Sequence, residues 1–380
     1  MTGGRCPVAA KPLDEATSAA GLGRVYFPNL DGLRFVAFLL VYLQHGFGIG
    51  GLGGVGVAFF FVLSGFLITF LILTEIERTG QIDVGAFYVR RILRIWPLYY
   101  AVLFYCFIVY PVSKQVLGLP PTLQAGNPLW YAFFLSNFDV IRSGGTEGAM
   151  STNVTWSVAI EEQFYLTWPL LFRFVPVRRQ LLLFLGIIGG SVAFRLAHAS
   201  TPPVLYFHSL SVISDMAIGG LAAYSWRRSA KFRSSVVALP RLFIGAVYCV
   251  GGTMLGLSYL GIGSFFNPLE RIVVAFLFAF IVLEQNFSRA SFFKMVQFRW
   301  VTLFGRYTYG LYLLHAIVVT LLGRALFVAR VDAYGGWGRL VLGPVGLGLS
   351  IALAALSYHG FEKPFLDLKS RFTHVRSGGP

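Results

Sequence analysis

The sequence predicts an all-α fold, a polytopic transmembrane bundle of about ten spanning helices. Of its 380 residues, 56% are hydrophobic and only 12% are charged, whereas soluble domains carry about 25% charged residues. Apolar runs near the ~20 residues that a helix needs to cross a bilayer recur along the whole chain. This composition suits a lipid solvent better than a single water-soluble core.

The expected spans follow one another between polar clusters or clusters that contain Gly and Pro, which punctuate helices. The run at 97–112 is the shortest of them. The apolar stretch 128–138 is too brief to cross easily, and we expect it to be re-entrant or interfacial. We expect spans at 31–50, 54–74, 97–112, 157–175, 180–197, 206–226, 240–261, 266–287, 303–328 and 338–360.

The basic residues predict the orientation of these spans. With a cytosolic N-terminus, 23 of the 31 Lys and Arg residues fall in cytosolic segments and four in outside loops. Cytosolic segments of membrane proteins carry this excess of positive charge. The net charge of +15 therefore indicates topology rather than a nucleic-acid surface. We expect a cytosolic tail at 1–30, one transmembrane domain at 31–365 and a second cytosolic tail at 366–380.

Several other signals are missing from the sequence. The first 30 residues hold no apolar core with a cleavage site, so we expect no cleaved signal peptide. The three cysteines show no CxxC spacing, and we expect neither a metal site nor a disulfide framework. We find no internal repeat in the sequence and expect no soluble catalytic domain at either end. Any chemistry is therefore expected within the membrane body.

Two ionisable residues of the first span invite a functional hypothesis, because charges inside a bilayer are costly. Arg34 and His45 are 11 positions apart, a rotation of ~1100° that puts both on one helix face, roughly 16 Å apart along the axis. Arginine binds phosphate or a carbonyl oxygen. Histidine can remove a hydroxyl proton or accept an acyl group. The plainer alternative is that Arg34 extends to the interface and His45 bonds a neighbouring helix.

Six motifs in order resemble those of the acyltransferase-3 family, membrane-bound O-acyltransferases of bacterial surface glycans, antibiotics and glycolipids. The first is Arg34 followed after ten residues by His45, which is similar to the family's Arg-x10-His signature. The resemblance extends over about 28–365. The other five motifs are Phe-Phe-Val-Leu-Ser-Gly-Phe-Leu-Ile at 60–68, Arg-Ile-Leu-Arg-Ile-Trp-Pro at 91–97, Trp-Ser-Val-Ala-Ile-Glu-Glu-Gln-Phe-Tyr at 156–165, Tyr-Gly-Leu-Tyr-Leu-Leu-His at 309–315, and Ser357-Tyr358 with Glu-Lys-Pro-Phe at 362–365.

The resemblance implies acyl-CoA as the donor and a catalytic histidine at His45. It also implies that Arg34, Arg91 and Arg94 assist donor binding. Arg90, Arg91 and Arg94 crowd the expected cytosolic entrance of the third span, and arginine forks bind phosphate charges such as those of CoA. The alternative is that this cluster only anchors the topology.

Two adjacent carboxylates, Glu161 and Glu162, begin the fourth span. Neighbouring helix positions point about 100° apart, so at most one of them is expected to face a cavity. The family pattern fits Glu161 best as the inward, catalytic residue, which would orient His45 or bond the acceptor hydroxyl. Compensation of the helix N-terminus is the structural alternative.

The remaining candidates would line a pocket for donor or acceptor. His315 lies mid-span, where a buried, hydrogen-bonded structural histidine is almost as good a reading. Asp215 also lies mid-span and needs a partner. We favour a buried ion pair with Arg195 or Arg271, with acceptor binding as the second reading. The pocket candidates are Tyr309, His315, Asp215, Trp156 and Ser64.

The sequence thus predicts an integral O-acyltransferase of the bacterial inner (plasma) membrane. It would move an acyl group, expected to be acetyl, from cytosolic acyl-CoA to a hydroxyl of a carbohydrate-containing acceptor. That acceptor could be a surface polysaccharide, lipopolysaccharide, glycolipid or glycosylated metabolite. Acyl-CoA is a co-substrate, and we expect no permanently bound cofactor, no metal and no nucleic acid.

The alternative is a secondary transporter or a glycan flippase or exporter. It would also have about ten helices with intramembrane Arg, Asp and His. Transporters often carry two related halves, and no such halves are found in this sequence. A flippase or polymerase would be expected to have a large basic outside loop, but 113–156 holds only two basic residues.

Overall fold

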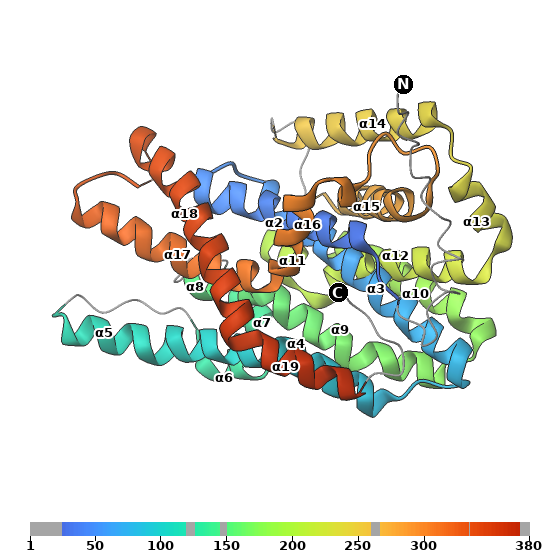
Figure 1. Cartoon of the computed structure of the whole chain (residues 1–380), viewed down its shortest axis with the longest axis horizontal. Helices are drawn as coiled ribbons and strands as arrows, with labels where there is room; N and C mark the ends of the chain where they lie inside the picture. The colour runs from blue at the N-terminus through green and yellow to red at the C-terminus, as the bar shows by residue number, and fades with distance from the viewer. Residues whose placement is uncertain (1–24, 119–125, 145–149, 260–266, 334, 373–380) are drawn as a thin grey trace, which may run out of the picture.

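The computed structural model describes residues 25–118, 126–144, 150–259, 267–333 and 335–372 (Figure 1). Within these ranges the chain forms helices and no β-strand. The predicted all-α fold class is therefore confirmed. Residues 1–24 of the expected N-terminal tail lie outside the described residues, and the first described helix, α2, already begins at Pro28.

The helices of the N-terminal half overlap every segment in which a span is expected there. They are α2 (Pro28–Phe47), α3 (Leu52–Thr79), α4 (Val84–Phe104), η1 (Tyr105–Val109), α5 (Tyr110–Val116), α6 (Pro128–Ala132), α7 (Ser136–Arg142), α8 (Met150–Asn153), α9 (Thr155–Phe174), η2 (Val177–Arg179) and α10 (Gln180–Ala197).

The C-terminal half continues in the same way. Its helices are α11 (Pro202–Phe207), α12 (Ser209–Arg228), α13 (Ala230–Val237), α14 (Arg241–Tyr259), α15 (Glu270–Phe287), η3 (Met295–Gln297), α16 (Arg299–Arg306), α17 (Thr308–Val328), α18 (Gly336–Ser357), η4 (Tyr358–Glu362), α19 (Lys363–Lys369) and η5 (Ser370–Phe372). α19 thus runs into the expected C-terminal tail.

Local sequence explains where the site-bearing helices begin and end. α2 starts with Pro28, whose missing N–H costs nothing in a first turn. It stops at Gly48, which takes a left-handed conformation with φ of 69° and donates its N–H back to Gln44. The Asp83 side chain caps α4 by accepting from the Ala86 N–H at 2.9 Å.

The third span is longer than expected. α4, η1 and α5 form one continuous helical segment, Val84–Val116, in which Pro97 lies inside the helix rather than at its start. The expected start at 97 was wrong because the arginines before it were assigned to a loop. Arg91 and Arg94 instead project from α4, where a helix holds them at fixed spacing. The segment 128–138 forms the short helices α6 and part of α7.

Six helical segments of the described chain are long and apolar enough to cross a membrane. The bent pair α13 and α14, which turns by 85°, would make a seventh span. α2, α9 and α15 do not pass this test. α2 carries Asp31 and Arg34, and α9 carries Glu161, on faces that line the cavity described below. The count of about ten spans therefore stays a prediction.

The centre of the bundle is α3, which packs against α2, α12 and α15 (Figure 1). α3 and α12 approach closely at two glycines. A Cβ on Gly65 would collide with the Met216 carbonyl, and a Cβ on Gly219 would collide with the Val62 carbonyl. Small residues let membrane helices approach in this way. This contact positions α3, which forms one wall of the site described below.

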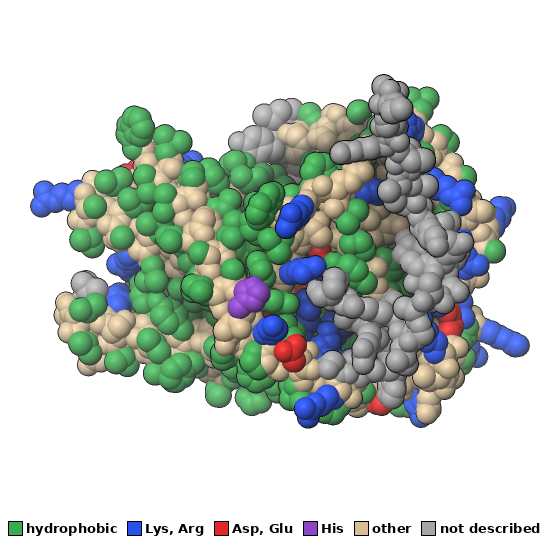
Figure 2. Space-filling view, viewed as in Figure 1, with side chains coloured by type: hydrophobic (Ala, Val, Ile, Leu, Met, Phe, Trp, Pro, Cys, Tyr) green, Lys and Arg blue, Asp and Glu red, His purple; other side chains and the backbone are tan. Residues whose placement is uncertain are grey.

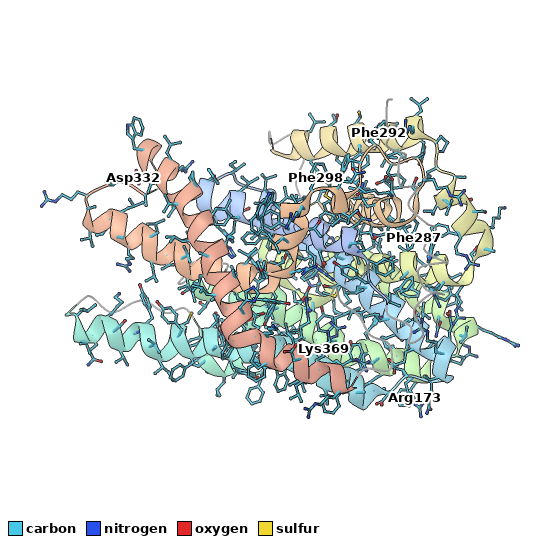
Figure 3. The ribbon with its side chains drawn as sticks, viewed as in Figure 1. Arg173, Phe287, Phe292, Phe298, Asp332 and Lys369 are labelled. Atoms are coloured by element: carbon cyan, nitrogen blue, oxygen red, sulfur yellow. The ribbon has the colours of Figure 1, made fainter. Side chains whose placement is uncertain are left out.

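Charge divides the molecule into two ends. Asp332, between α17 and α18, and Arg173, at the end of α9, mark these ends in Figure 3. Many hydrophobic side chains and a few basic ones lie on the surface around α5, α17 and α18, and more basic side chains lie from the middle toward the opposite end (Figure 2). The basic end is the one that the sequence assigns to the cytosol.

Candidate active site

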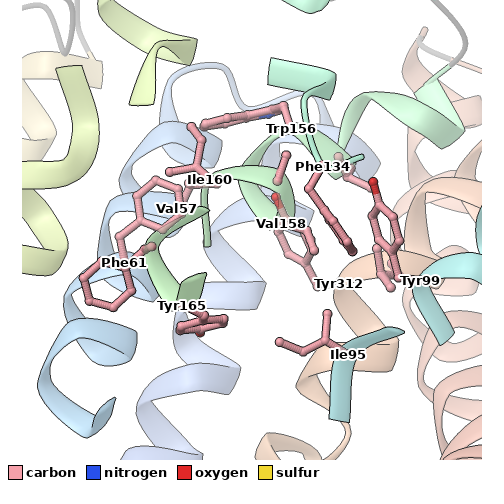
Figure 4. Packing of buried hydrophobic residues seen from close by; sticks show 14 of the residues in the cluster. Val57, Phe61, Ile95, Tyr99, Phe134, Trp156, Val158, Ile160, Tyr165 and Tyr312 are labelled. Carbon is pink, nitrogen blue, oxygen red and sulfur yellow. The ribbon is translucent and has the colours of Figure 1, made fainter. Parts of the chain in front are cut away.

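A cavity of about 350 Å³ lies between the helices that carry most of the candidate site residues. Its walls come from α2, α3, α4, α9 and α17, and α16 and α19 each add a basic side chain. Val57, Ile95, Val158 and Tyr165, which Figure 4 labels among packed neighbours, belong to its lining. The volume suits a small organic group.

On the α2 wall, an ion pair fixes Arg34. Its Nη1 lies 3.0 Å from Oδ1 of Asp31, one turn earlier on the same helix. The Tyr26 hydroxyl donates to the other carboxylate oxygen at 2.9 Å. Burial and the charge of Asp31 raise the pKa of Tyr26, so this hydroxyl remains a donor. Arg34 therefore faces the cavity and does not extend into lipid.

Other basic side chains converge on the same space. Arg91 and Arg94 come from α4, Arg306 from the end of α16 and Lys369 from α19. Lys369 is labelled on α19 in Figure 3. The guanidinium carbon of Arg91 lies 5.3 Å from the centre of the Tyr165 ring, a cation–π contact that holds the fork in place. With Arg34, five basic side chains and two acidic ones, Asp31 and Glu161, line the cavity.

Arg90 lies outside this cavity, although it is next to Arg91 in sequence. Its Nη2 is 3.1 Å from Oε2 of the buried Glu75, and its Nη1 donates to the Phe372 carbonyl at 2.8 Å. Adjacent helix positions point about 100° apart. This arginine ties α4 to α3 and to the C-terminal segment.

On α9, Glu161 lines the cavity and Glu162 does not. The Ser64 hydroxyl donates to Oε1 of Glu161 at 2.8 Å, and the Tyr165 hydroxyl lies 3.3 Å from Oε2. Glu162 instead accepts from the Trp96 indole at 3.0 Å. The placement agrees with the expected inward orientation of Glu161, and Ser64 and Tyr165 aim its carboxylate.

His45 lies in the last turn of α2 and contacts His315 of α17. Nδ1 of His45 is 2.9 Å from Nε2 of His315, and the two ring planes differ by only 14°. Nδ1 of His315 is 3.0 Å from the Leu311 carbonyl oxygen. His315 is fully buried, whereas His45 is partly exposed. The two histidines thus form a hydrogen-bonded pair across two helices.

The cavity ends before it reaches this pair. Tyr312, which lines the cavity, packs against Phe60 with ring centres 5.6 Å apart and against His315 at 5.9 Å. The Tyr312 hydroxyl is hydrogen-bonded to Ser157 at 2.6 Å. In the described structure, one aromatic ring therefore separates the cavity from the histidine pair.

Two other candidates lie elsewhere. Asp215 is buried in an ion pair with Arg271, whose Nε and Nη2 lie 2.9 and 2.6 Å from Oδ2. The sequence favoured a buried ion pair with either Arg195 or Arg271, and the structure gives the pair with Arg271. Trp156 is buried against Tyr206 and Phe207, with ring centres 5.3 and 5.0 Å away. Neither Asp215 nor Trp156 lines the cavity.

The cavity brings together six of the candidate residues and leaves out five. Tyr165 could have been found from the sequence, because it lies one helical turn after Glu161. Arg306 and Lys369 have no local sequence pattern that indicates a site. The sequence shows them only as basic residues of segments assigned to the cytosol. The cavity includes Arg34, Ser64, Arg91, Arg94, Glu161 and Tyr309, and it excludes His45, Arg90, Trp156, Asp215 and His315.

Comparison with known proteins adds an independent finding. The profile of a family described as an acyltransferase domain matches residues 27–359. The chain is 28% identical to peptidoglycan O-acetyltransferase OatA of Listeria monocytogenes, over 90% of this chain and 56% of that protein. It is 29% identical to YrhL of Bacillus subtilis, named as a candidate peptidoglycan O-acetyltransferase, over 89% and 55%. It therefore spans about half the length of these relatives. No solved structure matches it.

Proposed function

Because the chain belongs to the acyltransferase domain family, which covers residues 27–359, we propose that it is a membrane-bound O-acyltransferase. It would take an acyl group, acetyl in the first instance, from acyl-CoA and transfer it to a hydroxyl of a carbohydrate-containing acceptor. The observation that carries this proposal is the basic cavity, which ends one aromatic ring away from the pair of His45 and His315. A transporter would not need a histidine pair at the end of a basic pocket.

The charge of the cavity supports a phosphorylated donor. Arg91, Arg94, Arg306 and Lys369 lie on segments that the sequence assigns to the cytosolic side. Arginine forks bind phosphate through paired, charge-assisted hydrogen bonds. The phosphates of CoA would sit among these groups, and the thinner pantetheine arm would extend toward Tyr312.

The proposed reaction uses His45 as a general base. His45 takes the proton of the acceptor hydroxyl, and the hydroxyl oxygen attacks the thioester carbonyl. The C–S bond breaks as the ester C–O bond forms, and the CoA sulfur recovers the proton from His45. Arg34, roughly 16 Å from His45 along the helix axis, would hold the donor rather than contact the reacting carbonyl oxygen.

A variant of this scheme moves the acyl group first to His45 and then to the acceptor. Mixing the purified protein with labelled acetyl-CoA, without acceptor, separates the two schemes. Label that stays on the quenched wild-type chain, and not on His45→Ala, would establish the covalent intermediate. Rapid loss of thioester only when acceptor is present would establish direct transfer.

Tyr312 has to move for the thioester to reach His45. Its ring contacts those of Phe60 and His315, and its hydroxyl is hydrogen-bonded to Ser157. Rotation of this single side chain would join the cavity to the partly exposed His45. In the position that the structure shows, this ring would also keep water away from the thioester path.

The acceptor is proposed from chemistry and from the names of the relatives. His45 is partly exposed near the end of α2 that the sequence places outside. An acceptor hydroxyl would therefore arrive from the far side of the membrane. Peptidoglycan fragments are the first carbohydrates to test, followed by lipopolysaccharide and glycolipids.

The decisive experiment measures CoA thiol release by purified protein in lipid nanodiscs, with acetyl-CoA and a panel of glycans. We expect release to depend on a carbohydrate acceptor and to be abolished in His45→Ala. His198→Ala is the matched control, because His198 lies at the end of α10 and outside the cavity. Wild-type release by His45→Ala, or glycan movement without thiol release, would overturn the proposal.

A further inference from the structure

We propose that His315 is a positioning residue that fixes the tautomer of His45 and so makes Nε2 of His45 the reactive nitrogen. This inference rests on the proposed function, because it assigns a chemical task to His45. It goes beyond the pocket role that the sequence suggested for His315. The inference is based on a chain of two hydrogen bonds that runs from the Leu311 carbonyl through His315 to His45.

The protons of this chain can be counted from its far end. Nδ1 of His315 lies 3.0 Å from the carbonyl oxygen of Leu311. A carbonyl can only accept, so this nitrogen carries a proton. A neutral imidazole has a single N–H, and Nε2 of His315 is therefore an acceptor.

The second link transfers this constraint to the other ring. Nδ1 of His45 lies 2.9 Å from Nε2 of His315, with the ring planes only 14° apart. Because the His315 nitrogen accepts, Nδ1 of His45 must donate. The single proton of a neutral His45 is then on Nδ1, and its lone pair is on Nε2. That nitrogen has no hydrogen-bond partner among the residues that the structure describes.

The surroundings of His315 favour this arrangement over the opposite one. The opposite tautomer would direct the His45 lone pair at His315 and leave Nε2 unable to take a proton. It would require a proton on Nε2 of His315, and a ring protonated on both nitrogens would be a buried cation. Rings of Phe38, Tyr42 and Tyr312 surround His315, with centres 5.5, 6.1 and 5.9 Å away. These groups offer no charge to balance such a cation.

His315 also restrains where the His45 ring points. His45 belongs to the last turn of α2, three residues before the left-handed Gly48. Helix ends fray and tolerate several side-chain rotamers. His315 is fixed by its own helix, since its partner is the carbonyl four residues earlier. The pair thus holds a terminal side chain with a rigid mid-helix one.

Three substitutions at this position separate positioning from packing. His315→Gln can bring an amide oxygen to the place of Nε2 and accept from His45. His315→Asn can bond the Leu311 carbonyl but is too short to reach His45. His315→Leu keeps a bulky apolar group and offers no hydrogen bond. All three are compared with wild type in nanodiscs, using acetyl-CoA and the acceptor that the wild type uses.

We expect kcat to fall about 100-fold or more in His315→Asn and His315→Leu, because general-base catalysis contributes 10²–10⁴-fold. The KM for acetyl-CoA should change by less than about threefold in both, since the donor pocket is untouched. His315→Gln should keep kcat within about tenfold of wild type, because an acceptor is restored. Equal losses of kcat in all three variants, with intact protein, would overturn the inference and indicate packing alone.

A second measurement reads the tautomer directly. The full chain is labelled with ¹⁵N-histidine, and the His45 signals are identified by their absence in His45→Gln. We expect wild-type His45 to be protonated at Nδ1 and unprotonated at Nε2, and His315→Leu to populate both tautomers. A wild-type His45 protonated at Nε2 would overturn the inference. If His45→Ala were active, the proposed function would fail; if only His315→Leu were active, the function would stand and the positioning role would fail.

Discussion

The buried ion pair of Asp215 and Arg271 allows a direct test of whether a charged residue inside this bundle stabilises the fold or binds the acceptor. It joins α12 to the first turn of α15, and the two side chains are 0% and 1% exposed. Both contacts converge on a single carboxylate oxygen. Asp215→Asn would leave the Arg271 charge buried without its counter-charge. Breaking a buried pair in this way costs about 3–5 kcal/mol.

Removing both charges should cost less than removing one. Asp215→Asn combined with Arg271→Gln removes both charges of the pair, and the two amides can hydrogen-bond to each other. The buried Arg195 nearby keeps its hydrogen bonds to the Ser211 hydroxyl and to the Leu205 carbonyl. We expect this double variant to be more stable than either single variant, which is the signature of an energetically coupled pair. The assay is unfolding in mixed detergent micelles, followed by loss of tertiary signal, with the free energy of unfolding compared across the four proteins.

The same four proteins test whether Asp215 binds the acceptor. If its role is structural, the double variant should keep kcat and the acceptor KM within about threefold of wild type. A rise in acceptor KM for Asp215→Asn, together with unchanged stability, would refute the structural assignment. Additive stability losses in the double variant would show that the two charges are not coupled.

Two further predictions concern the cavity, and a third concerns the membrane topology. Glu161→Gln should lower kcat by about 10-fold or more because it removes the carboxylate that Ser64 orients. Glu162→Gln should keep kcat near wild type. A larger loss of kcat in Glu162→Gln than in Glu161→Gln would contradict the assignment of Glu161 to the cavity. Arg94→Gln should raise the KM for acetyl-CoA about 10-fold, since a charge-assisted hydrogen bond contributes ~1.5–3 kcal/mol. Arg90→Gln should leave the KM for acetyl-CoA unchanged and lower the free energy of unfolding. A raised KM in Arg90→Gln with an unchanged KM in Arg94→Gln would contradict the roles assigned to these two arginines. Leu117→Cys in a cysteine-free chain should react with a membrane-impermeant thiol reagent in intact cells; protection until lysis would invert the predicted topology.

The fold class and much of the site were accessible from sequence because their signals are local. Hydropathy and length predict helices wherever they occur, and each expected span contains one. Helix geometry indicates that at most one of Glu161 and Glu162 faces a cavity, and the family resemblance selects Glu161. The third span was misplaced at its start because Arg90, Arg91 and Arg94 look like a loop until the helix around them is seen.

Contacts between distant helices were not accessible in this way. Arg90 and Arg91 are neighbours in sequence, yet one is bound to Glu75 and the other lines the cavity. Arg306 and Lys369 reach the cavity from helices whose positions depend on the whole bundle. No spacing rule predicts such convergence, because it depends on helix packing and on which glycines allow close approach.

By itself, the sequence determined that this protein is a helical membrane protein with an uneven distribution of basic charge, and that Arg34 and His45 share one face of a helix. Composition, periodicity and helical geometry are properties of a single segment, and they can be read along the chain. Only the tertiary structure decided that Arg34 faces a basic cavity while His45 contacts a histidine 270 positions away. Packing between helices alone brings such residues together, and it separates these two by the ring of Tyr312.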